Sequence, residues 1–467
     1  MKKASGFVFL ALFIFSISGS PQTATTTKTP PQPAEKIIYG NMPRAAIPYG
    51  RYRKAYKDWF IEPDTLEYNG AARSAPAVNL KNLSGINIGF LGPLGADNPD
   101  SHYGIAMLHG AQLAIADANA AGGYEGKPFV LKIHDDLPLW GASSMDIVKM
   151  DFDEHVWAML GSIDAASTHI ALRATLKLEI PIIDTGTTDP TVTETRIQWL
   201  LHDFPDDRQQ GYALADYIIN QLKLKRIAII RANNRYGRKG DEKFIDMARR
   251  LGHEPILLMK YSDGQRDFSK LLTAVQANHA DALVLWGDAE TAGRILRQMR
   301  AMGLKQPVFG SSRIAYPDVI RVAGPAAEGL VAVSAMDPSR KDPKWQSFRE
   351  RYVQRYHAEP DPYASYAYDG MTILIAAIRK AGLNRGRIMD ALRGHEMKEY
   401  HGVSGQVFFD YTLNNIAPVS FARVKNGKFE YWLARRTDWK GNRAPPRADP
   451  PSVPRSADRL RHPRGPK

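Results

Sequence analysis

Short apolar runs alternate with amphipathic stretches along the chain from residue 86 onward. In the first half the apolar runs are "INIGFLG" (86–92), "FVLKIHDD" (129–136), "VWAMLGS" (156–162) and "IPIID" (180–184). The stretch 104–123 between the first two carries apolar side chains at the spacing of one helix face: Met107, Ala111, Ala114, Ile115 and Ala118. Strands and helices alternating in this way predict a parallel sheet with crossover helices.

A second alternation of similar size begins near Asp207. Its predicted strands are "RIAIIRA" (226–232), "PILLMKY" (255–261), "ALVLWG" (282–287) and "PVFGS" (307–311), with helices between them. Further helices are predicted near 343–357, 364–382 and 386–394, followed by strands at 405–410 and 420–432. The Asn426-Gly427 pair inside the last stretch is typical of a tight hairpin turn.

The length of 467 residues favours two domains, because one hydrophobic core seldom supports so long a chain. Two lysines, an apolar run and then small residues open the sequence, an order typical of a secretory signal peptide over residues 1–24. A membrane anchor is the alternative, but the run is shorter than the roughly 20 residues that span a bilayer. The chain has no cysteine, which excludes disulfides, thiol chemistry and a lipoprotein anchor.

The net charge of +13 is unevenly distributed. A Pro-rich tail over 439–467 holds eight Lys or Arg against two Asp, and a Thr/Pro-rich linker with an irregular aromatic arm is expected over 25–83. The tail is expected to be a solvated end; contact with anionic lipid, peptidoglycan or an acidic partner is the alternative. The charge therefore does not indicate nucleic-acid binding.

Ligands of open parallel sheets bind beyond the carboxyl ends of the strands. Hydroxyl-rich loops follow two strands of the first half, with Ser167 and Thr168 in one and Thr187 and Thr188 in the other. Either pair can cap a helix; alternatively, free N–H groups at the helix start hold a ligand carboxylate. Further candidates at strand ends are Tyr103, Tyr236, Asp288, Ser312 and Arg313.

No catalytic set or cofactor motif is present. The glycines at 89, 92 and 95 do not fit a dinucleotide fingerprint, and P-loop, G-x-S-x-G and H-E-x-x-H patterns are absent. His134-Asp135-Asp136 lacks a second ligand pair at metal-site spacing, so a metal is not expected either. The sequence favours a binding protein over an enzyme.

Several segments, in order, are similar to the branched-chain amino-acid binding proteins, which are type I periplasmic binding proteins serving ATP-driven importers. They include "IGFLGPLG" from residue 88, "LGSIDAASTHIALRA" (160–174), "IPIIDTGTTDPTVTE" (180–194), "DDRQQGYALADYI" (206–218) and "RIAIIRANNRYGRKG" (226–240). The resemblance implies two α/β lobes joined by three crossover strands. It places one lobe at 84–206 plus 337–408, and the other at 207–336 plus 409–438.

The resemblance also implies a ligand site. Ala165, Ser167, Gly186, Thr187 and Thr188 fall on the family's carboxylate-binding cluster, and Tyr236 falls on its second-lobe tyrosine.

The residues that meet the ligand's amino group in the family are not matched. Ser312, with Arg313 beside it, stands where amino-acid binders have an acidic residue, and Asp288 replaces an aromatic residue. Because a buried ammonium without a counter-charge costs several kcal/mol, either Asp288 has taken over that role or the ligand has no amino group. In the second case Arg235 or Arg313 would pair with another anionic group.

The function implied is a periplasmic solute-binding component of an importer. Its partners would be a small amino acid or organic acid and a membrane permease, with no cofactor and no nucleic acid. A sensory or accessory module of an exported redox or signalling system is the alternative, suggested by the arm and the tail. An exported enzyme is the third class, but no reacting group supports it.

Overall fold

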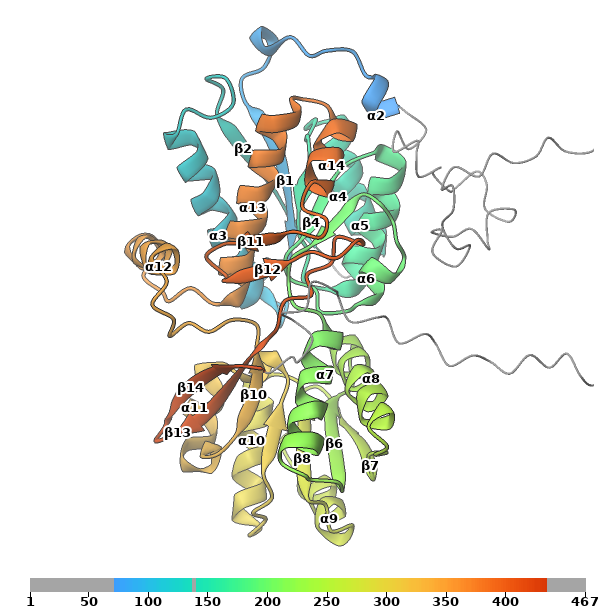
Figure 1. Cartoon of the computed structure of the whole chain (residues 1–467), viewed down its shortest axis with the longest axis vertical. Coiled ribbons are helices and arrows are strands. Elements are labelled where there is room, and N and C mark those ends of the chain that lie inside the picture. Colours follow the sequence, from blue (N-terminus) through green and yellow to red (C-terminus); the bar gives the residue numbers. More distant parts are fainter. Residues whose placement is uncertain (1–70, 137–139, 435–467) are drawn as a thin grey trace, which may run out of the picture.

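The computed structural model describes residues 71–136 and 140–434. The described chain forms two lobes, drawn one above the other in Figure 1. The predicted signal peptide, the basic tail and the linker with most of the aromatic arm lie outside the described residues. The end of the arm forms two short turns, α2 (Ala71–Ser74) and η2 (Leu80–Asn82). No helix in the described part is both long and apolar enough to cross a membrane.

The first lobe is built on a five-stranded parallel sheet in the order β2-β1-β3-β4-β5. Its strands are β1 (Ile86–Gly92), β2 (Phe129–Asp135), β3 (Met159–Leu160), β4 (Ile182–Asp184) and β5 (Leu200–His202). The helices between them are α3 (Ser101–Ala120), α4 (Trp140–Phe152), α5 (Ala165–Leu178) and α6 (Thr191–Glu194). Later in the chain, α12 (Pro343–Tyr356), α13 (Pro362–Ala381), α14 (Arg385–Arg393) and the small sheet β11 (Glu399–His401) and β12 (Gln406–Phe408) complete the lobe.

The second lobe is built on a seven-stranded sheet in the order β14-β13-β10-β9-β8-β6-β7. Its strands are β6 (Ile227–Ala232), β7 (Leu257–Tyr261), β8 (Ala282–Trp286), β9 (Val308–Gly310), β10 (Val331–Ser334), β13 (Ser420–Lys425) and β14 (Lys428–Leu433). Its helices are α7 (Asp207–Asp216), α8 (Arg235–Arg250), α9 (Ser269–Ala277), α10 (Ala289–Ala301) and α11 (Pro317–Ala323). The predicted hairpin at Asn426-Gly427 is confirmed: β13 and β14 pair antiparallel across it.

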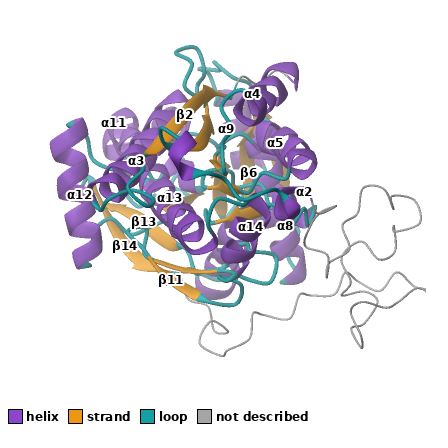
Figure 2. Ribbon diagram, turned by 90° about the horizontal axis from the view of Figure 1, so that it is seen from above, coloured by secondary structure: helices purple, strands orange, loops and turns teal. Residues whose placement is uncertain are grey.

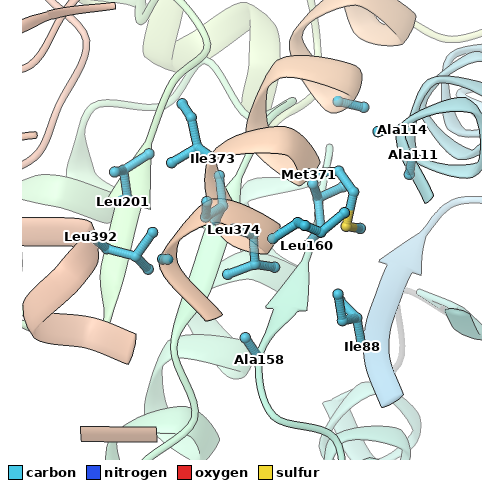
Figure 3. Close-up of a cluster of buried hydrophobic side chains, with 14 of the residues drawn as sticks. Ile88, Ala111, Ala114, Ala158, Leu160, Leu201, Met371, Ile373, Leu374 and Leu392 are labelled. Atoms are coloured by element: carbon cyan, nitrogen blue, oxygen red, sulfur yellow. The ribbon is translucent and has the colours of Figure 1, made fainter. Parts of the chain in front are cut away.

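The core of the first lobe depends on a helix that comes late in the chain. Met371 and Leu374 of α13 lie against Ile88 and Leu160 of the sheet, with α3 beside them (Figure 3). Helices α3 and α13 approach so closely that a Cβ on Gly110 would lie 2.0 Å from the carbonyl oxygen of Ala364. Seen from above, helices flank the strands, and β11, β13 and β14 lie at one edge of the molecule (Figure 2). The prediction of an α/β fold is thus confirmed.

The chain passes between the lobes three times, after β5, after β10 and between β12 and β13. The first and third crossings lie side by side, because His202 pairs with Asn414 and the Asn415 side-chain amide donates to the carbonyl oxygen of Asp203 at 2.7 Å. Side-by-side crossings of this kind form a hinge about which two lobes can rotate.

Candidate ligand-binding site

A cavity of about 500 Å³ lies between the lobes, where loops following strands of both sheets meet. From the first lobe it is lined by residues 95–100, 135–136, 163–165 and 187–189. From the start of α7 and the second lobe it is lined by Asp207, Asn234, Arg235, Tyr236, Lys239 and Arg313. Its place beyond the strand ends is the one expected for a ligand of open α/β sheets.

The cavity brings together five of the residues that the sequence indicated, namely Ala165, Thr187, Thr188, Tyr236 and Arg313. The other six, Tyr103, Ser167, Thr168, Gly186, Asp288 and Ser312, do not line it. Ser312 lies behind the cavity, where its backbone N donates to Gln210 Oε1 at 3.3 Å.

Tyr103 is buried in an aromatic cluster next to the cavity. Its ring centroid lies 4.7 Å from that of Tyr363 and 5.3 Å from that of Tyr316. The Arg313 guanidinium lies 5.1 Å from the Tyr103 ring centroid, so Tyr103 supports the arginine that does line the cavity. Gly104 follows it because a Cβ there would lie 1.9 Å from the carbonyl oxygen of Pro93.

Four backbone donors at the predicted carboxylate site already have partners in the protein. Asp164 caps α5 through its carboxylate, which accepts from the backbone N of Ser167 at 2.8 Å, and its carbonyl oxygen accepts from the backbone N of Thr168. Asp184 accepts in the same way from the backbone N–H groups of Gly186 and Thr187. The backbone N–H groups of Ala165 and Thr188, which line the cavity, have no such partner, so N–H groups as well as side-chain hydroxyls are available donors in this region.

Two buried hydroxyls that line the cavity make no hydrogen bond with regular geometry, those of Thr187 and Tyr236. The hydroxyls of Ser311 and Ser312 lie close enough to that of Tyr236 to interact with it. Burial raises the pKa of Tyr236 to about 12, so its hydroxyl keeps its proton at neutral pH and can donate. Unpaired buried polar groups are unusual in folded proteins, so these two hydroxyls are candidates for contact with a ligand.

Two arginines of the second lobe reach across the cavity to carboxylates of the first. Nη1 of Arg313 lies 3.1 Å from both carboxylate oxygens of Asp100, and its Nε donates to the Tyr363 hydroxyl at 3.1 Å. Arg235 pairs with Asp189, with an Nη2–Oδ2 distance of 2.6 Å. Both lobes are therefore tied together on the two sides of the cavity.

Asp288 occupies a different kind of position. It is exposed, and its carboxylate caps α10 by accepting from the backbone N of Thr291 at 2.8 Å. An aspartate directly before a helix is a favoured capping residue, so its location after β8 has a local structural reason.

Two carboxylates that line the cavity were not among the site residues predicted from sequence. Asp136, after β2, is 1% exposed, and Asp207, the first residue of α7, is fully buried. Neither carboxylate oxygen of Asp207 accepts a hydrogen bond with regular geometry, and Oδ1 of Asp136 has no partner. Burial raises the pKa of Asp207 well above its usual range and that of Asp136 to about 8. The only signal in the sequence was their place: Asp136 directly follows a strand, and Asp207 begins a helix.

No group of three or more His, Asp or Glu side chains in the described part of the chain is arranged to hold a metal ion. His134 instead lies between Asp146 and Glu154, at 3.0 Å from each.

Two α/β lobes, a three-segment hinge and a polar cavity between the strand ends define a two-lobed solute-binding protein. The family model for periplasmic binding proteins matches residues 85–428. The chain belongs to this family, in the type I branch of the Leu/Ile/Val-binding proteins, whose members bind solutes and are not enzymes.

The relatives agree with this assignment. An amino acid binding protein of Pseudomonas aeruginosa is 28% identical over 337 residues, which cover 71% of this chain and 88% of the relative. A Leu/Ile/Val-binding protein homolog of Brucella suis is 29% identical, covering 61% and 76%. The branched-chain amino acid transporter substrate binding protein LivJ of Streptococcus pneumoniae, solved with isoleucine, is 25% identical with a TM-score of 0.67. The match covers 75% of this chain and 99% of LivJ.

Proposed function

We propose that the protein is the solute-binding subunit of an ABC importer and captures an amino acid between its lobes. The observation that carries the proposal is a set of buried polar groups in one cavity that make no hydrogen bond with regular geometry: the hydroxyls of Thr187 and Tyr236 and the carboxylate of Asp207. These groups are complementary to a zwitterion, which needs donors for its carboxylate and an anion for its ammonium.

The energetics favour this pairing. A buried polar group left without a partner costs about 1–3 kcal/mol, and this cost is recovered when a ligand satisfies the group. Asp207 would receive the ammonium in place of the acidic residue that is absent at Ser312. The hydroxyls of Thr187 and Tyr236 would donate to the carboxylate.

The importer context is supported by the relatives. The S. pneumoniae relative is a transporter substrate-binding protein, and the P. aeruginosa and B. suis relatives are amino-acid-binding proteins. Hinge closure around a ligand gives a membrane permease a shape to recognise. The cross-lobe pairs of Arg313 and Arg235 would stabilise that closed shape.

A thermal-melt screen of the purified protein against the common amino acids tests the proposal. A ligand at about one hundred times its Kd adds about 2.7 kcal/mol to the free energy of unfolding, which raises the melting temperature measurably. Thr187→Val and Tyr236→Phe should each reduce the shift. Thr195→Val is the matched control, because the Thr195 hydroxyl donates to the carbonyl oxygen of Val192 outside the cavity. If no amino acid raises the melting temperature, the proposal is wrong.

A further inference from the structure

The cavity carries more negative charge than an amino acid with an uncharged side chain requires. Three cationic side chains line it, those of Arg235, Lys239 and Arg313, against seven aspartates. The two arginines are already paired with Asp189 and Asp100. The ammonium of Lys239 lies 3.0 Å from Glu242, which is outside the lining.

Some of the remaining aspartates have structural tasks. Asp135 accepts from the backbone N of Leu94 at 2.7 Å, and Asp164 caps α5. Both tasks favour the ionised carboxylate, so these residues add to the negative potential. Asp136 and Asp207 are the buried ones with unpaired oxygens, although the Ser162 hydroxyl donates to Oδ2 of Asp136.

Asp136 and Asp207 lie at separate positions. Asp136 follows β2, at one edge of the sheet, whereas the backbone N of Asp207 donates to the carbonyl oxygen of Thr188, after β4. These strands are three places apart, so with neighbours about 4.8 Å apart their ends are separated by about 14 Å. At this spacing of the strand ends, we expect the two carboxylates to meet different groups of a ligand. Two hydrogen bonds of about 2.9 Å and an extended side chain with a terminal cation fill such a span.

We propose that the ligand is an α-amino acid whose side chain carries a second cationic group, an ammonium or a guanidinium. Asp207 receives the α-ammonium, and Asp136 receives the side-chain cation and so determines specificity. This inference rests on the proposed function, since it names the class of amino acid taken by the same cavity.

The charges around the two carboxylates support the assignment. Asp136 faces the carboxylates of Asp164, Asp135 and Asp100, and Asp207 faces Asp189, Asp206 and Arg313. Because burial raises the pKa of Asp136 to about 8, this carboxyl is mostly protonated at pH 7 when the site is empty. A cation bound beside it stabilises the ionised form, so binding of a dicationic ligand releases a proton from Asp136.

Calorimetric titration of the purified full chain with lysine, ornithine and norleucine tests the inference. Norleucine matches lysine in length but has no side-chain cation. We expect lysine or ornithine to bind about thirty-fold more tightly than norleucine, or better, since buried charge pairs have effects of this size. Asp136→Asn should reduce this preference to about threefold or less. The exposed Asp263→Asn is the matched control.

A second measurement needs no variant. Titrations at pH 7 in two buffers of different ionisation enthalpy count the protons released, and lysine should release more than norleucine. Equal or tighter binding of norleucine, or equal proton release, overturns the inference while the proposed function stands. If none of the common amino acids binds, the proposed function itself fails.

Discussion

The guanidinium of Arg313, in the second lobe, lies 3.1 Å from both carboxylate oxygens of Asp100, in the first. The same guanidinium is stacked over the Tyr236 ring, 4.3 Å from its centroid. This cation is therefore fixed both to the opposite lobe and to its own. The cavity is held closed by the chain's own charges, and a ligand need not supply all of the closing energy.

Breaking this contact should open the protein. Arg313→Met removes the cross-lobe pair but keeps most of the side-chain volume. Hydrogen bonds to charged groups contribute about 1.5–3 kcal/mol, so we expect a larger open population and an affinity weakened about tenfold or more. Small-angle scattering of the ligand-free protein should show an increased radius of gyration. Arg249→Ala, on the surface of α8, is the control. An unchanged radius of gyration in Arg313→Met would show that the pair of Arg313 and Asp100 does not hold the lobes together.

Asp207→Asn should separate binding from folding. The substitution keeps the shape of the side chain but removes the charge proposed to receive the ammonium. We expect amino-acid binding to weaken by about 2–5 kcal/mol, measured by calorimetry. The melting temperature of the free protein at pH 8 should not fall, because burial raises the pKa of Asp207 and its ionisation opposes folding. If Asp207→Asn retained its affinity for amino acids, another residue would have to bind the ligand's ammonium group.

The free protein should be more stable at pH 5.5 than at pH 8. Burial, followed by the nearby Asp369 and Asp184, raises the pKa of Asp203 well above its usual range, and burial raises those of Asp184 and Asp369 to about 6. These carboxyls bind more protons in the folded state than in the unfolded chain, so their contribution to stability falls as pH rises from about 4 upward. Burial lowers the pKa values of His102, His109, His169 and His395, which acts in the opposite direction but only below about pH 7.

Asp203→Asn provides the test of this pH dependence by calorimetric melting. Both carboxylate oxygens of Asp203 are buried without partners, so the variant should melt higher at pH 8 and depend less on pH. Despite burial, hydrogen bonds from Thr191 and the charge of Arg235 lower the pKa of Asp189, and Arg208 lowers that of Asp206. These two carboxylates change the pH dependence of stability only below about pH 4. A wild-type melting temperature that rises from pH 5.5 to 8 would refute the prediction.

Asp288→Ala should affect stability and spare binding. Because the carboxylate caps α10 and does not line the cavity, its loss should cost about 0.5–2 kcal/mol of unfolding free energy. Affinity for the best ligand of the thermal screen should change less than twofold, which is about 0.4 kcal/mol. A loss of affinity as large as that expected for Asp207→Asn would show that Asp288, and not Asp207, binds the ligand's ammonium group.

The α/β alternation could be predicted because most strands contain a short apolar run and several helices repeat an apolar face, although α4 (Trp140–Phe152) and β5 (Leu200–His202) were not predicted. The late helix at 364–382 was predicted as well, and α13 spans Pro362–Ala381. Its place in the first-lobe core could not be read from periodicity, since that depends on contacts between residues far apart in sequence.

The site was harder to predict for a physical reason. Asp288 and Asp207 both stand at the start of a helix, and local sequence cannot tell a capping carboxylate from an unpaired one. Only the three-dimensional neighbours do so: Asp288 is exposed, whereas Asp207 is buried beside Thr188 and faces the cavity. Thr187 and Tyr236 were easier to predict, because the resemblance to the branched-chain amino-acid binding proteins places both residues in the ligand site.

The three passages of the chain between the lobes also bear on biosynthesis. The sheet of the first lobe is complete by His202, but the helix that covers it, α13, is made only after nearly all of the second lobe. A growing chain of this topology cannot close its first core until translation is almost finished. The first lobe therefore acquires its complete core only late in synthesis.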